Sequence, residues 1–424
     1  MSRGRHASLL IVTTFEIVAL SGQGCPGPLP SASGGGAVYN NTTDATNGGA
    51  AYLGSAACRA CHPEVDARQS LHGHAHMLNR ILGQPPAYPA QAVRAGVPAP
   101  PAGYAWNDVS YVLGGYIRKA KFIRQDGFIL AGGDTSLLAQ WDLSFPPAGT
   151  LPGFVSYEPP ATAVAVPYAY ACFVCHVTGP QAQDPSHPGF QENRLGFVGT
   201  WQEAGIQCES CHGPGSYHPP NAAARTMYVD VRASACGICH ARSAGAGVIQ
   251  ASGGFIDHHQ QYPELLASGG HAGFDCITCH DPHAGTNYDR ANAIRNECTA
   301  CHPNKNMALH EGKVYARGDY GEVLTCTSCH MPFATRSASS VVIGESAGRV
   351  GDMRTHIFRI NTAPVDYTGM FTADLTRVVK DAEGRAAVTL DFVCLRCHNT
   401  DGGYPFRLTL SSASDAAPGL HGFQ

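Results

Sequence analysis

The residues of this 424-residue chain with the clearest chemistry are its cysteines, because 16 of the 17 occur in one repeated pattern, Cys-x-x-Cys-His. In each unit, two thiols three positions apart are followed at once by an imidazole. Such a unit can join both thiols to the vinyl groups of a porphyrin while its histidine reaches the iron, and this is the attachment pattern of c-type haem. The eight units, called motifs 1 to 8 in chain order, are Cys58–His62, Cys172–His176, Cys208–His212, Cys236–His240, Cys276–His280, Cys298–His302, Cys326–His330 and Cys394–His398.

The eight motifs predict eight covalently bound haem c groups. The predicted thioether cysteines are Cys58, Cys61, Cys172, Cys175, Cys208, Cys211, Cys236, Cys239, Cys276, Cys279, Cys298, Cys301, Cys326, Cys329, Cys394 and Cys397. The predicted proximal iron ligands are His62, His176, His212, His240, His280, His302, His330 and His398.

Other uses of paired cysteines fit this pattern less well. A disulfide framework gives no reason for a histidine after every second cysteine. A structural zinc site takes four ligands, usually from two paired units, and does not require that histidine. A thioredoxin-like motif normally occurs once, near a βαβ pattern. Only Cys25 lies outside the motifs.

The histidines outside the motifs bear directly on function, because an iron held by one motif histidine has a second, open face. A second histidine makes the iron suited to passing electrons, a methionine raises its potential, and an open face can bind a substrate. Twelve of the 21 histidines remain after the motif histidines and His6 are set aside, which is enough to close every iron. We expect the distal ligands at His74, His218, His258, His259, His271, His283, His310 and His356. Less favoured candidates are His72, His76, His187, His421, Met77 and Met331.

Two of the expected distal ligands flank motif 5 in the stretch HAGFDCITCHDPHAG, residues 271–285. The chain between the motif and either His271 or His283 is too short to reach the opposite face of the haem attached there. Each is therefore predicted to cap a haem attached elsewhere, which would tie several haems into one block.

Two further groups of histidines are close together in the sequence. His258 and His259 are adjacent, so in an extended segment their side chains diverge and can reach two different haems. The cluster His72–His76 is expected to give one ligand to the haem of motif 1.

The N-terminal region predicts export. An apolar run, Ala7–Leu20, follows two arginines and is too short to span a bilayer, but it suits a signal peptide. Residues 1–24 are expected to be a leader and residues 25–51 a flexible linker. Haem is attached covalently outside the cytoplasm, so we expect a periplasmic, outer-membrane-associated or extracellular protein. Cys25 is a candidate lipid anchor, and no transmembrane span is expected.

The composition favours loops over long elements. The chain has 49 glycines, 29 prolines and 14% charged residues, and its net charge of −4 with no basic tract gives no support to nucleic-acid binding. With roughly 50 residues per haem, the porphyrins must supply much of the buried apolar surface. The expected fold class is that of a multihaem cytochrome c, with mostly irregular loops and short helices wrapped around a haem chain, and a few β-hairpins.

Short strands are expected in two places. DVSYVLGGY (108–116) and KAKFIRQDGFIL (119–130) have strand-like composition, with a turn at Gln125–Gly127, and Asp381–Gly384 lies between two further β-prone runs. The predicted regions are therefore a one-haem region with short strands (52–171), a six-haem region (172–345) and a C-terminal region with a β-hairpin and the eighth haem (346–424).

Several stretches resemble the multihaem c-type cytochromes, in particular the octahaem ones. They are GSAACRACHPE followed by GHAHML, then CESCHGPGSYH, CITCHDPHAG and CTSCHMP, and the resemblance extends from about Tyr52 to His398. It implies closely packed, mostly bis-histidine haems that pass electrons outside the cytoplasm, and it places the recurrent histidine of GHAHML at His74. Some members of this group polymerise into extracellular filaments, and others are octahaem or multihaem oxidoreductases.

The sequence thus favours an exported octahaem electron-transfer protein rather than an enzyme. Its expected partners are redox proteins or extracellular electron acceptors, and a homopolymer is a further candidate. The alternative is an oxidoreductase of small nitrogen or sulfur compounds with one open catalytic haem. No Cys-x-x-Cys-Lys unit is present, and the histidine supply is sufficient to close every iron, so both observations weigh against this alternative.

Overall fold

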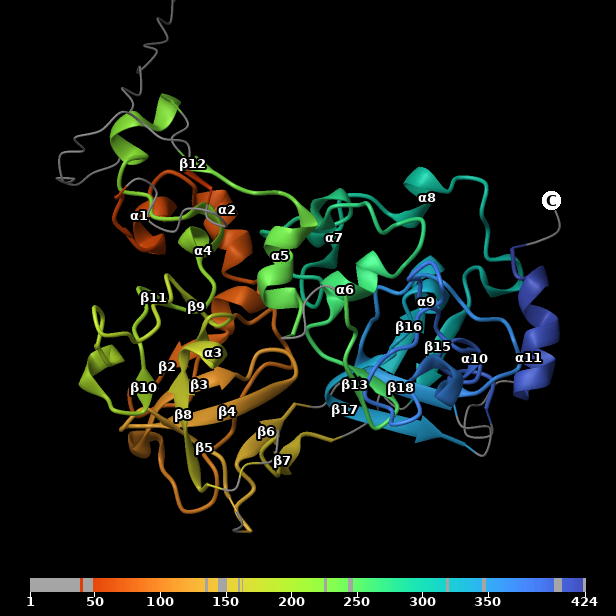
Figure 1. The fold of residues 1–424 in the computed structure, drawn as a ribbon, viewed down its shortest axis with the longest axis horizontal. Coiled ribbons are helices and arrows are strands. Elements are labelled where there is room, and N and C mark those ends of the chain that lie inside the picture. Colours follow the sequence, from red (N-terminus) through yellow and green to blue (C-terminus); the bar gives the residue numbers. More distant parts are fainter. Residues whose placement is uncertain are drawn as a thin grey trace, which may run out of the picture.

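The chain folds around two β-sheets and a band of short helices. The computed structural model describes residues 39–40, 49–133, 136–143, 151–158, 161, 163–224, 227–242, 247–317, 320–344, 348–399 and 406–421. Figure 1 shows the two sheets toward opposite ends of the long axis, with the short helices running above them from one end to the other. The predicted leader and Cys25 lie outside the described residues.

The first sheet has eight strands, ordered β10-β8-β5-β4-β3-β2, with β6 paired to β4 and β7 paired to β6. Its strands are β2 (Leu78–Arg80), β3 (Val109–Gly114), β4 (Lys119–Arg124), β5 (Phe128–Leu130), β6 (Gln140–Asp142), β7 (Gly153–Val155), β8 (Ala165–Ala169) and β10 (Phe197–Val198).

Both faces of this sheet are buried, because neighbouring residues along its strands point to opposite sides. On β3, Tyr111 packs into one hydrophobic cluster and Val112 into another. The same alternation occurs on β4, where Phe122 and Ile123 belong to different clusters. The sheet is therefore a rigid base with a conventional core on each face.

The second sheet has four strands in the order β13-β14-β17-β18. Its middle pair, β14 and β17, is parallel, and the outer pairs are antiparallel. The strands are β13 (Ala251–Ser252), β14 (Phe255–Asp257), β17 (Thr335–Ile343) and β18 (Gly348–Met353). Two-stranded ladders complete the β structure: β1 (Tyr39–Asn40) with β12 (Met227–Tyr228), β9 (Val177–Thr178) with β11 (Glu203–Ala204), and β15 (Val314–Arg317) with β16 (Tyr320–Val323).

The helices are all short. The α-helices are α1 (Ser55–Arg59), α2 (Pro63–Gln69), α3 (Tyr170–Phe173), α4 (Cys208–His212), α5 (Ala233–His240), α6 (Gln261–Leu266), α7 (Arg290–Ala293), α8 (Cys298–Cys301), α9 (Cys326–His330), α10 (Leu390–Val393) and α11 (Leu410–Ala416). The 3₁₀ turns are η1 (Gly73–His76), η2 (Trp106–Asp108), η4 (Gln191–Asn193), η5 (Pro219–Ala224), η6 (Cys276–Thr278), η7 (Ala308–His310), η8 (Tyr367–Met370) and η9 (Ala417–Gly419). Within the described parts of the chain, no helix has the length and hydrophobicity needed to cross a membrane.

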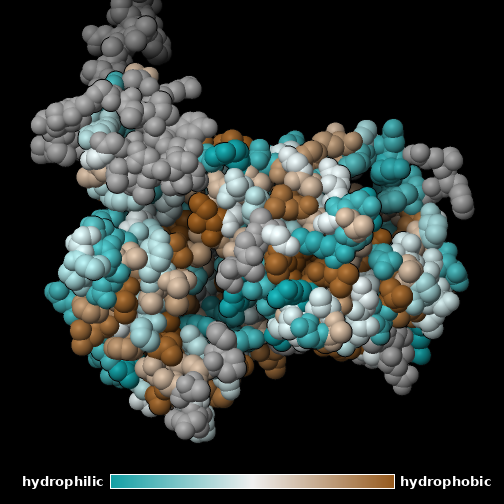
Figure 2. Space-filling view, in the orientation of Figure 1, coloured by the Kyte–Doolittle hydropathy of each residue, from teal (hydrophilic) through white to brown (hydrophobic). Residues whose placement is uncertain are grey.

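The short helices and long irregular connections agree with the expected fold class, whereas the sheets are larger than expected. The strands predicted at 108–116 and 119–130 are present as β3, β4 and β5. Five further strands join them in the same sheet, and these are too short to stand out in the sequence. Figure 2 shows hydrophobic side chains exposed across the middle of one face, where the band of helices lies.

The hairpin predicted at Asp381–Gly384 is wrong in part, because only its turn forms. The amide of Gly384 donates to the carbonyl of Asp381, but the flanking residues make bridges to other segments. Arg377 pairs with Gln250, and Val388 pairs with Ile360. Tertiary pairing here replaces the local ladder that the turn suggested.

The predicted region boundaries at 171/172 and 345/346 do not divide the fold. Strand β8 lies before the first boundary and pairs with β10 after it. Strands β17 and β18 lie on either side of the second boundary and form one antiparallel hairpin. Each predicted boundary therefore cuts through a continuous sheet.

A buried carboxylate stabilises an irregular stretch of β17. The register of β17 against β18 shifts between Thr335 and Ser340. Asp352, which has no exposed surface, accepts the backbone N–H groups of Ser337 at 2.7 Å, Ala338 at 2.8 Å and Ser339 at 3.1 Å. Ser337 is buried, and its N–H group would cost about 1–3 kcal/mol without a partner, whereas Ala338 and Ser339 are half-buried and would cost less.

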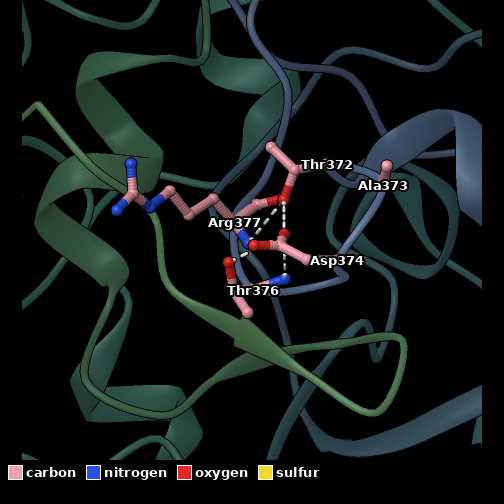
Figure 3. A pocket seen from close by; sticks show the side chains of 5 residues that line it. All are labelled: Thr372, Ala373, Asp374, Thr376 and Arg377. Atoms are coloured by element: carbon pink, nitrogen blue, oxygen red, sulfur yellow. Dashed lines mark hydrogen bonds between the residues drawn. The ribbon is translucent and has the colours of Figure 1, made fainter.

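Because the two oxygens of Asp352 serve three backbone donors, one of them fully buried, Asp352→Asn should lower the free energy of unfolding by about 1–3 kcal/mol. Chemical denaturation of the haem-loaded protein measures this. The control is Asp374→Asn on an exposed turn, where one carboxylate oxygen accepts from Thr372 and Thr376 and an amide oxygen can replace it (Figure 3). Equal effects of the two substitutions would contradict the role given to Asp352.

Candidate haem centres

Every Cys-x-x-Cys-His motif lies on a helical turn or begins directly after one. Motifs 3 and 7 form α4 and α9, and motif 4 ends α5. In motifs 1, 5, 6 and 8 the amide of the histidine donates to the carbonyl of the first cysteine at 2.9–3.0 Å. One turn of helix brings positions i, i+3 and i+4 to the same side, so both thiols and the imidazole can address one porphyrin.

The thiols of fifteen motif cysteines are free, as attachment to haem requires. Cys61 differs, because it is disulfide-bonded in the structure. A thioether at Cys61 would require that disulfide to be reduced first, so motif 1 presents one free thiol, that of Cys58.

Seven motif histidines face a second histidine ring across a gap. The pairs, with their ring-centre distances, are His62–His218 (6.2 Å), His212–His283 (6.2 Å), His240 with both His74 and His259 (6.0 Å each), His280–His356 (6.2 Å), His302–His271 (5.9 Å), His330–His421 (5.7 Å) and His398–His310 (6.0 Å). Two imidazoles that share one metal ion, each bonded at about 2 Å, have ring centres roughly 6 Å apart. The residues of these seven motifs therefore fit an iron with two histidine ligands.

Several of these rings are oriented by a hydrogen bond from Nδ1, which leaves Nε2 free to face the gap. Nδ1 of His330 donates to the carbonyl of Phe358 at 2.9 Å, and Nδ1 of His398 donates to that of Phe406 at 2.8 Å. Nδ1 of His421 donates to the carbonyl of Asn306 at 2.7 Å. A carboxylate of Asp281 lies 3.1 Å from Nδ1 of His283.

Burial keeps many of these imidazoles neutral, and only a neutral imidazole can bind a metal. It lowers the pKa of His212 to about 4 and the pKa of His356 to about 3. The same cause lowers the pKa of His259 to about 3, and neighbouring histidines add to the effect in all three cases.

Glu264 is a fully buried carboxyl group beside His356. It accepts the backbone N–H of His356 and, at 2.9 Å, the hydroxyl of Thr355. Burial raises the pKa of Glu264 to about 7, and the hydrogen bonds oppose this rise. Glu264 thereby fixes the backbone that presents His356 to motif 5.

The histidines that flank motif 5 each face a different motif. His271 faces His302 of motif 6, His283 faces His212 of motif 3, and His280 itself faces His356. Neither flanking ring faces His280. Residues 271–285 thus touch three separate pairs.

The structure places a different histidine opposite motif 1 from the one that the sequence predicted. The ring that faces His62 is His218, whereas His74 lies against His240 of motif 4 and stacks beside His72 at 4.2 Å. His72 accepts the amide of His74 through Nδ1, so the cluster is held by its own turn, η1. Since His259 also faces His240, two of the expected ligands converge on one motif.

His421 is the functional candidate that the sequence ranked low. It lies just beyond η9 and stacks against His330, 91 positions earlier, with an interplanar angle of 11°. Helix α11 packs against α10 and brings this C-terminal segment back to motifs 7 and 8. The sequence indicated a ligand role for His421 only in that more histidines lie outside the motifs than there are motifs. The other low-ranked histidines, His76 and His187, bond to Ser70 and to the Asp184–Ser186 turn.

Motif 2 is the exception. In the described part of the chain, no histidine ring faces His176 across a gap of this size, and its buried Nδ1 has no hydrogen-bond partner. Burial and the positive charge of Lys121 lower the pKa of His176 to about 4. His258, another expected distal ligand, faces no motif histidine and instead packs edge-on against His259 at 4.7 Å.

Positively charged groups gather beside motif 2. The ammonium of Lys121 lies over the ring of Tyr157, 4.0 Å from its centre, and Lys119 donates to the carbonyl of Ser337 at 2.6 Å. Arg242 lies 3.3 Å from Nδ1 of His258. Burial and the charge of Lys119 lower the pKa of Lys121 to about 7, and Glu158 opposes this. The cluster Lys119, Lys121 and Arg242 is called the cationic cluster below.

Contacts between cysteines of different motifs give the motifs an order in space. Neighbouring thiols relate motifs 1 and 3, motifs 2 and 4, and motifs 4 and 5; the pairs are Cys58–Cys208, Cys175–Cys239 and Cys236–Cys276. Closely placed thiols also link motifs 3 and 4, 5 and 6, 6 and 7, and 7 and 8; the pairs are Cys211–Cys236, Cys279–Cys301, Cys298–Cys326 and Cys329–Cys394. The motifs therefore form the line 1-3-4-5-6-7-8, with motif 2 attached at motif 4.

Residues 160–213, which contain motifs 2 and 3, match the family model described as cytochrome c554 and c-prime. A curated relative, the dissimilatory sulfite reductase MccA of Wolinella succinogenes, is 24% identical over 245 residues, which is 45% of this chain and 33% of the relative. The match thus spans a third of that relative's length.

Three solved structures are similar to this one. The octahaem sulfite reductase MccA of Wolinella succinogenes aligns with a TM-score of 0.52 and 17% identity over 88% of this chain and 67% of that chain. The outer cell wall cytochrome OcwA gives 0.46 and 19% over 77% and 82%. An undecahaem cytochrome from the S-layer of Carboxydothermus ferrireducens gives 0.41 and 17% over 74% and 53%. The predicted resemblance to multihaem c-type cytochromes is confirmed, and haem c is the cofactor of that family.

If His283 faces an iron held by motif 3, then His283→Met should change the ligand field of the haem on Cys208 and Cys211. The expected product is one haem with a raised potential, because methionine replaces histidine as a ligand. Redox titration with paramagnetic nuclear magnetic resonance measures this. A change confined to the haem on Cys276 and Cys279 would contradict the pairing, and His187→Met on an exposed turn is the control.

Proposed function

We propose that this chain, a multihaem c-type cytochrome, holds eight haems c and that seven of their irons are closed by two histidines. The proximal residues would be the motif histidines. The distal residues would be His218, His271, His283, His310, His356 and His421, with His74 or His259 serving motif 4. When bound, the haems supply one-electron transfer, and the side chains of this chain hold them and set their surroundings.

The order of the motifs supports electron transfer along one line of haems, with motif 2 as a side branch. Motifs 1 and 8 are the two ends of the line, and the thiol contact between Cys175 and Cys239 attaches motif 2 beside motif 4. Haem attachment to exported chains and the apolar leader together support a location outside the cytoplasm. Redox partner proteins or extracellular acceptors would exchange electrons at the ends of the line.

We propose further that motif 2 is an open site that binds a small oxyanion. The observation that carries this proposal is the lack of a facing histidine at His176 in the described residues, where the other seven motifs have one. A buried histidine with an empty side is the arrangement of an iron that can accept a substrate. Electrons would reach the haem of motif 2 from the haem of motif 4.

The cationic cluster gives the substrate class. Lys121 and Lys119 are largely buried, and a positive charge in a poorly solvated site attracts an anion more strongly than it would in water. Lys119 has Glu158 as a partner at 3.9 Å, and Lys121, whose pKa is lowered to about 7, is fully charged only below that pH. His258, whose pKa burial lowers well below the usual range, is a neutral hydrogen-bonding group beside them. These residues would orient the oxygen atoms of the anion and exclude water, and the lysines could donate a proton to an oxygen atom that leaves.

Sulfite is the first anion to test, because a similar protein is named as a dissimilatory sulfite reductase. The cationic cluster does not by itself distinguish sulfite from nitrite or another small oxyanion of nitrogen or sulfur. The alternative is an electron carrier whose eight irons are all closed, with His259 serving motif 2 and His74 serving motif 4.

Electron paramagnetic resonance of the oxidised protein distinguishes the two functions. The open site predicts one high-spin haem beside seven low-spin ones, and addition of sulfite or nitrite should change the high-spin signal alone. Eight low-spin signals, unaltered by either anion, would rule out the open site and leave the electron carrier.

A second experiment tests the cationic cluster. Lys121→Gln removes one charge-assisted contact, worth about 1.5–3 kcal/mol, so the dissociation constant for sulfite should rise by roughly tenfold or more. The control is Lys380→Gln, which removes a lysine that donates to the carbonyl of Gly247 and takes no part in the cationic cluster. An unchanged dissociation constant for Lys121→Gln would show that the cluster does not bind the anion.

A further inference from the structure

Three charged side chains, two of them buried and one partly buried, meet between motifs 7 and 8. They are Glu322 on β16, Arg354 just after β18, and Arg396, which lies inside motif 8 between Cys394 and Cys397. Arg396 is 1% exposed, and the side chain of Glu322 is 7% exposed. These three residues are called the Arg396 cluster.

Glu322 is the centre of this cluster. Its Oε2 accepts Nη1 of Arg396 at 3.1 Å, and its Oε1 accepts Nη2 of Arg354 at 2.8 Å. The hydroxyls of Ser328 and Tyr320 also donate to it, at 2.5 and 2.9 Å. One carboxylate is thus shared by two guanidinium groups.

The two arginines also hold the backbone of motif 7. Nη2 of Arg396 donates to the carbonyl of Ser328 at 3.1 Å, and Nη1 of Arg354 donates to those of Thr327 and Met331 at 2.9 Å. Since Ser328 and Thr327 lie between the two cysteines of motif 7, the cluster fastens one attachment loop to the other.

The cluster carries one net positive charge in a buried setting. Two guanidinium groups contribute +2 and Glu322 contributes −1. The other ionisable groups near Arg396 are the thiols of Cys329, Cys394 and Cys397 and the hydroxyls of Tyr315 and Tyr320. Burial raises the pKa of the three thiols and of Tyr320, and a thioether carries no charge, so these groups do not neutralise the cluster.

A buried positive charge favours the reduced state of a nearby redox centre, because reduction adds one negative charge and poor screening lets the attraction persist. Burial and hydrogen bonding around a haem are among the means by which a protein sets its reduction potential. Among the motifs, only motif 8 carries a fully buried arginine between its cysteines. Motif 1 also has an arginine between its cysteines, Arg59, one position earlier in the unit than Arg396, but the side chain of Arg59 is 63% exposed and pairs with Asp66.

We propose that the Arg396 cluster raises the reduction potentials of the haems on motifs 7 and 8 and so makes this end of the line the place where electrons collect. This inference rests on the proposed haem line, but it is independent of the open site at motif 2. It gives the line a direction, toward motif 8 and the C-terminal part of the chain.

The test is a spectroscopic redox titration of the haem-loaded protein at one fixed pH. Arg396→Met removes the charge and keeps much of the side-chain volume, while Glu322 keeps Arg354 as its partner. The expected result is a downward shift of two of the eight potentials, with the reduced-to-oxidised ratio at fixed potential falling at least tenfold, about 59 mV for one electron. Paramagnetic nuclear magnetic resonance should assign these two haems to motifs 7 and 8.

Glu322→Gln provides the opposite change, because it leaves both guanidinium charges and should raise the same two potentials. Arg59→Met in motif 1 is the matched control and should leave all eight potentials unchanged. Haem content and thermal unfolding of each variant show whether it is loaded and folded. If the Arg396→Met variant does not bind its full set of haems, the Glu322→Gln titration decides alone. Its expected result is a rise of the two potentials, whereas a loosened structure that admits water would lower them.

Unchanged potentials in a folded and fully loaded variant would overturn the proposal. So would a downward shift in both Arg396→Met and Glu322→Gln, since that result would mean that the cluster only holds the two loops together. Neither result bears on the high-spin signal at motif 2, so failure here is distinct from failure of the open site.

Discussion

The arrangement of this chain depends on one geometric constraint, the facing of two histidine rings roughly 6 Å apart across a gap. Among the described residues, seven motif histidines satisfy this constraint. Each pair of facing rings joins separate segments of the chain; the pair His62–His218, for example, joins motif 1 with the segment after motif 3. With an iron bound between its rings, as proposed, each pair would act as a cross-link between separate segments. Several such links would allow the chain to use single helical turns and irregular connections between them.

The sheets supply the rigidity that these turns lack. The first sheet is buried on both faces, and its edge approaches the second sheet through Lys119 and Ser337. Lys121, two residues along β4 from Lys119, places its positive charge next to His176 of motif 2. Near the motif 8 end of the line, two arginines share the carboxylate of Glu322 and leave one net positive charge. Positive charge thus lies beside His176 and also between motifs 7 and 8.

The sequence predicted the parts of the fold with strong local signals and missed those without. The strands at Val109–Gly114, Lys119–Arg124 and Phe128–Leu130 were predictable, because all three are rich in β-branched and aromatic residues and the Gln-Asp-Gly turn lies between the last two. The two-residue strand β10 and the three-residue strands β2 and β6 carry no such pattern, and only pairing with neighbours makes them strands. At Asp381–Gly384 the predicted turn forms, but the residues on either side pair with distant segments and not with each other.

The sequence by itself determined the attachment chemistry, because a Cys-x-x-Cys-His unit is complete within five residues and needs no distant partner. It also named the histidines from which partners are drawn. Only the tertiary structure decided which rings face each other. It placed His421 opposite His330, brought both His74 and His259 to His240, and left His176 with no facing ring among the described residues. The physical reason is that a facing ligand acts through space, so its partner is fixed by how distant segments pack and not by how residues are spaced.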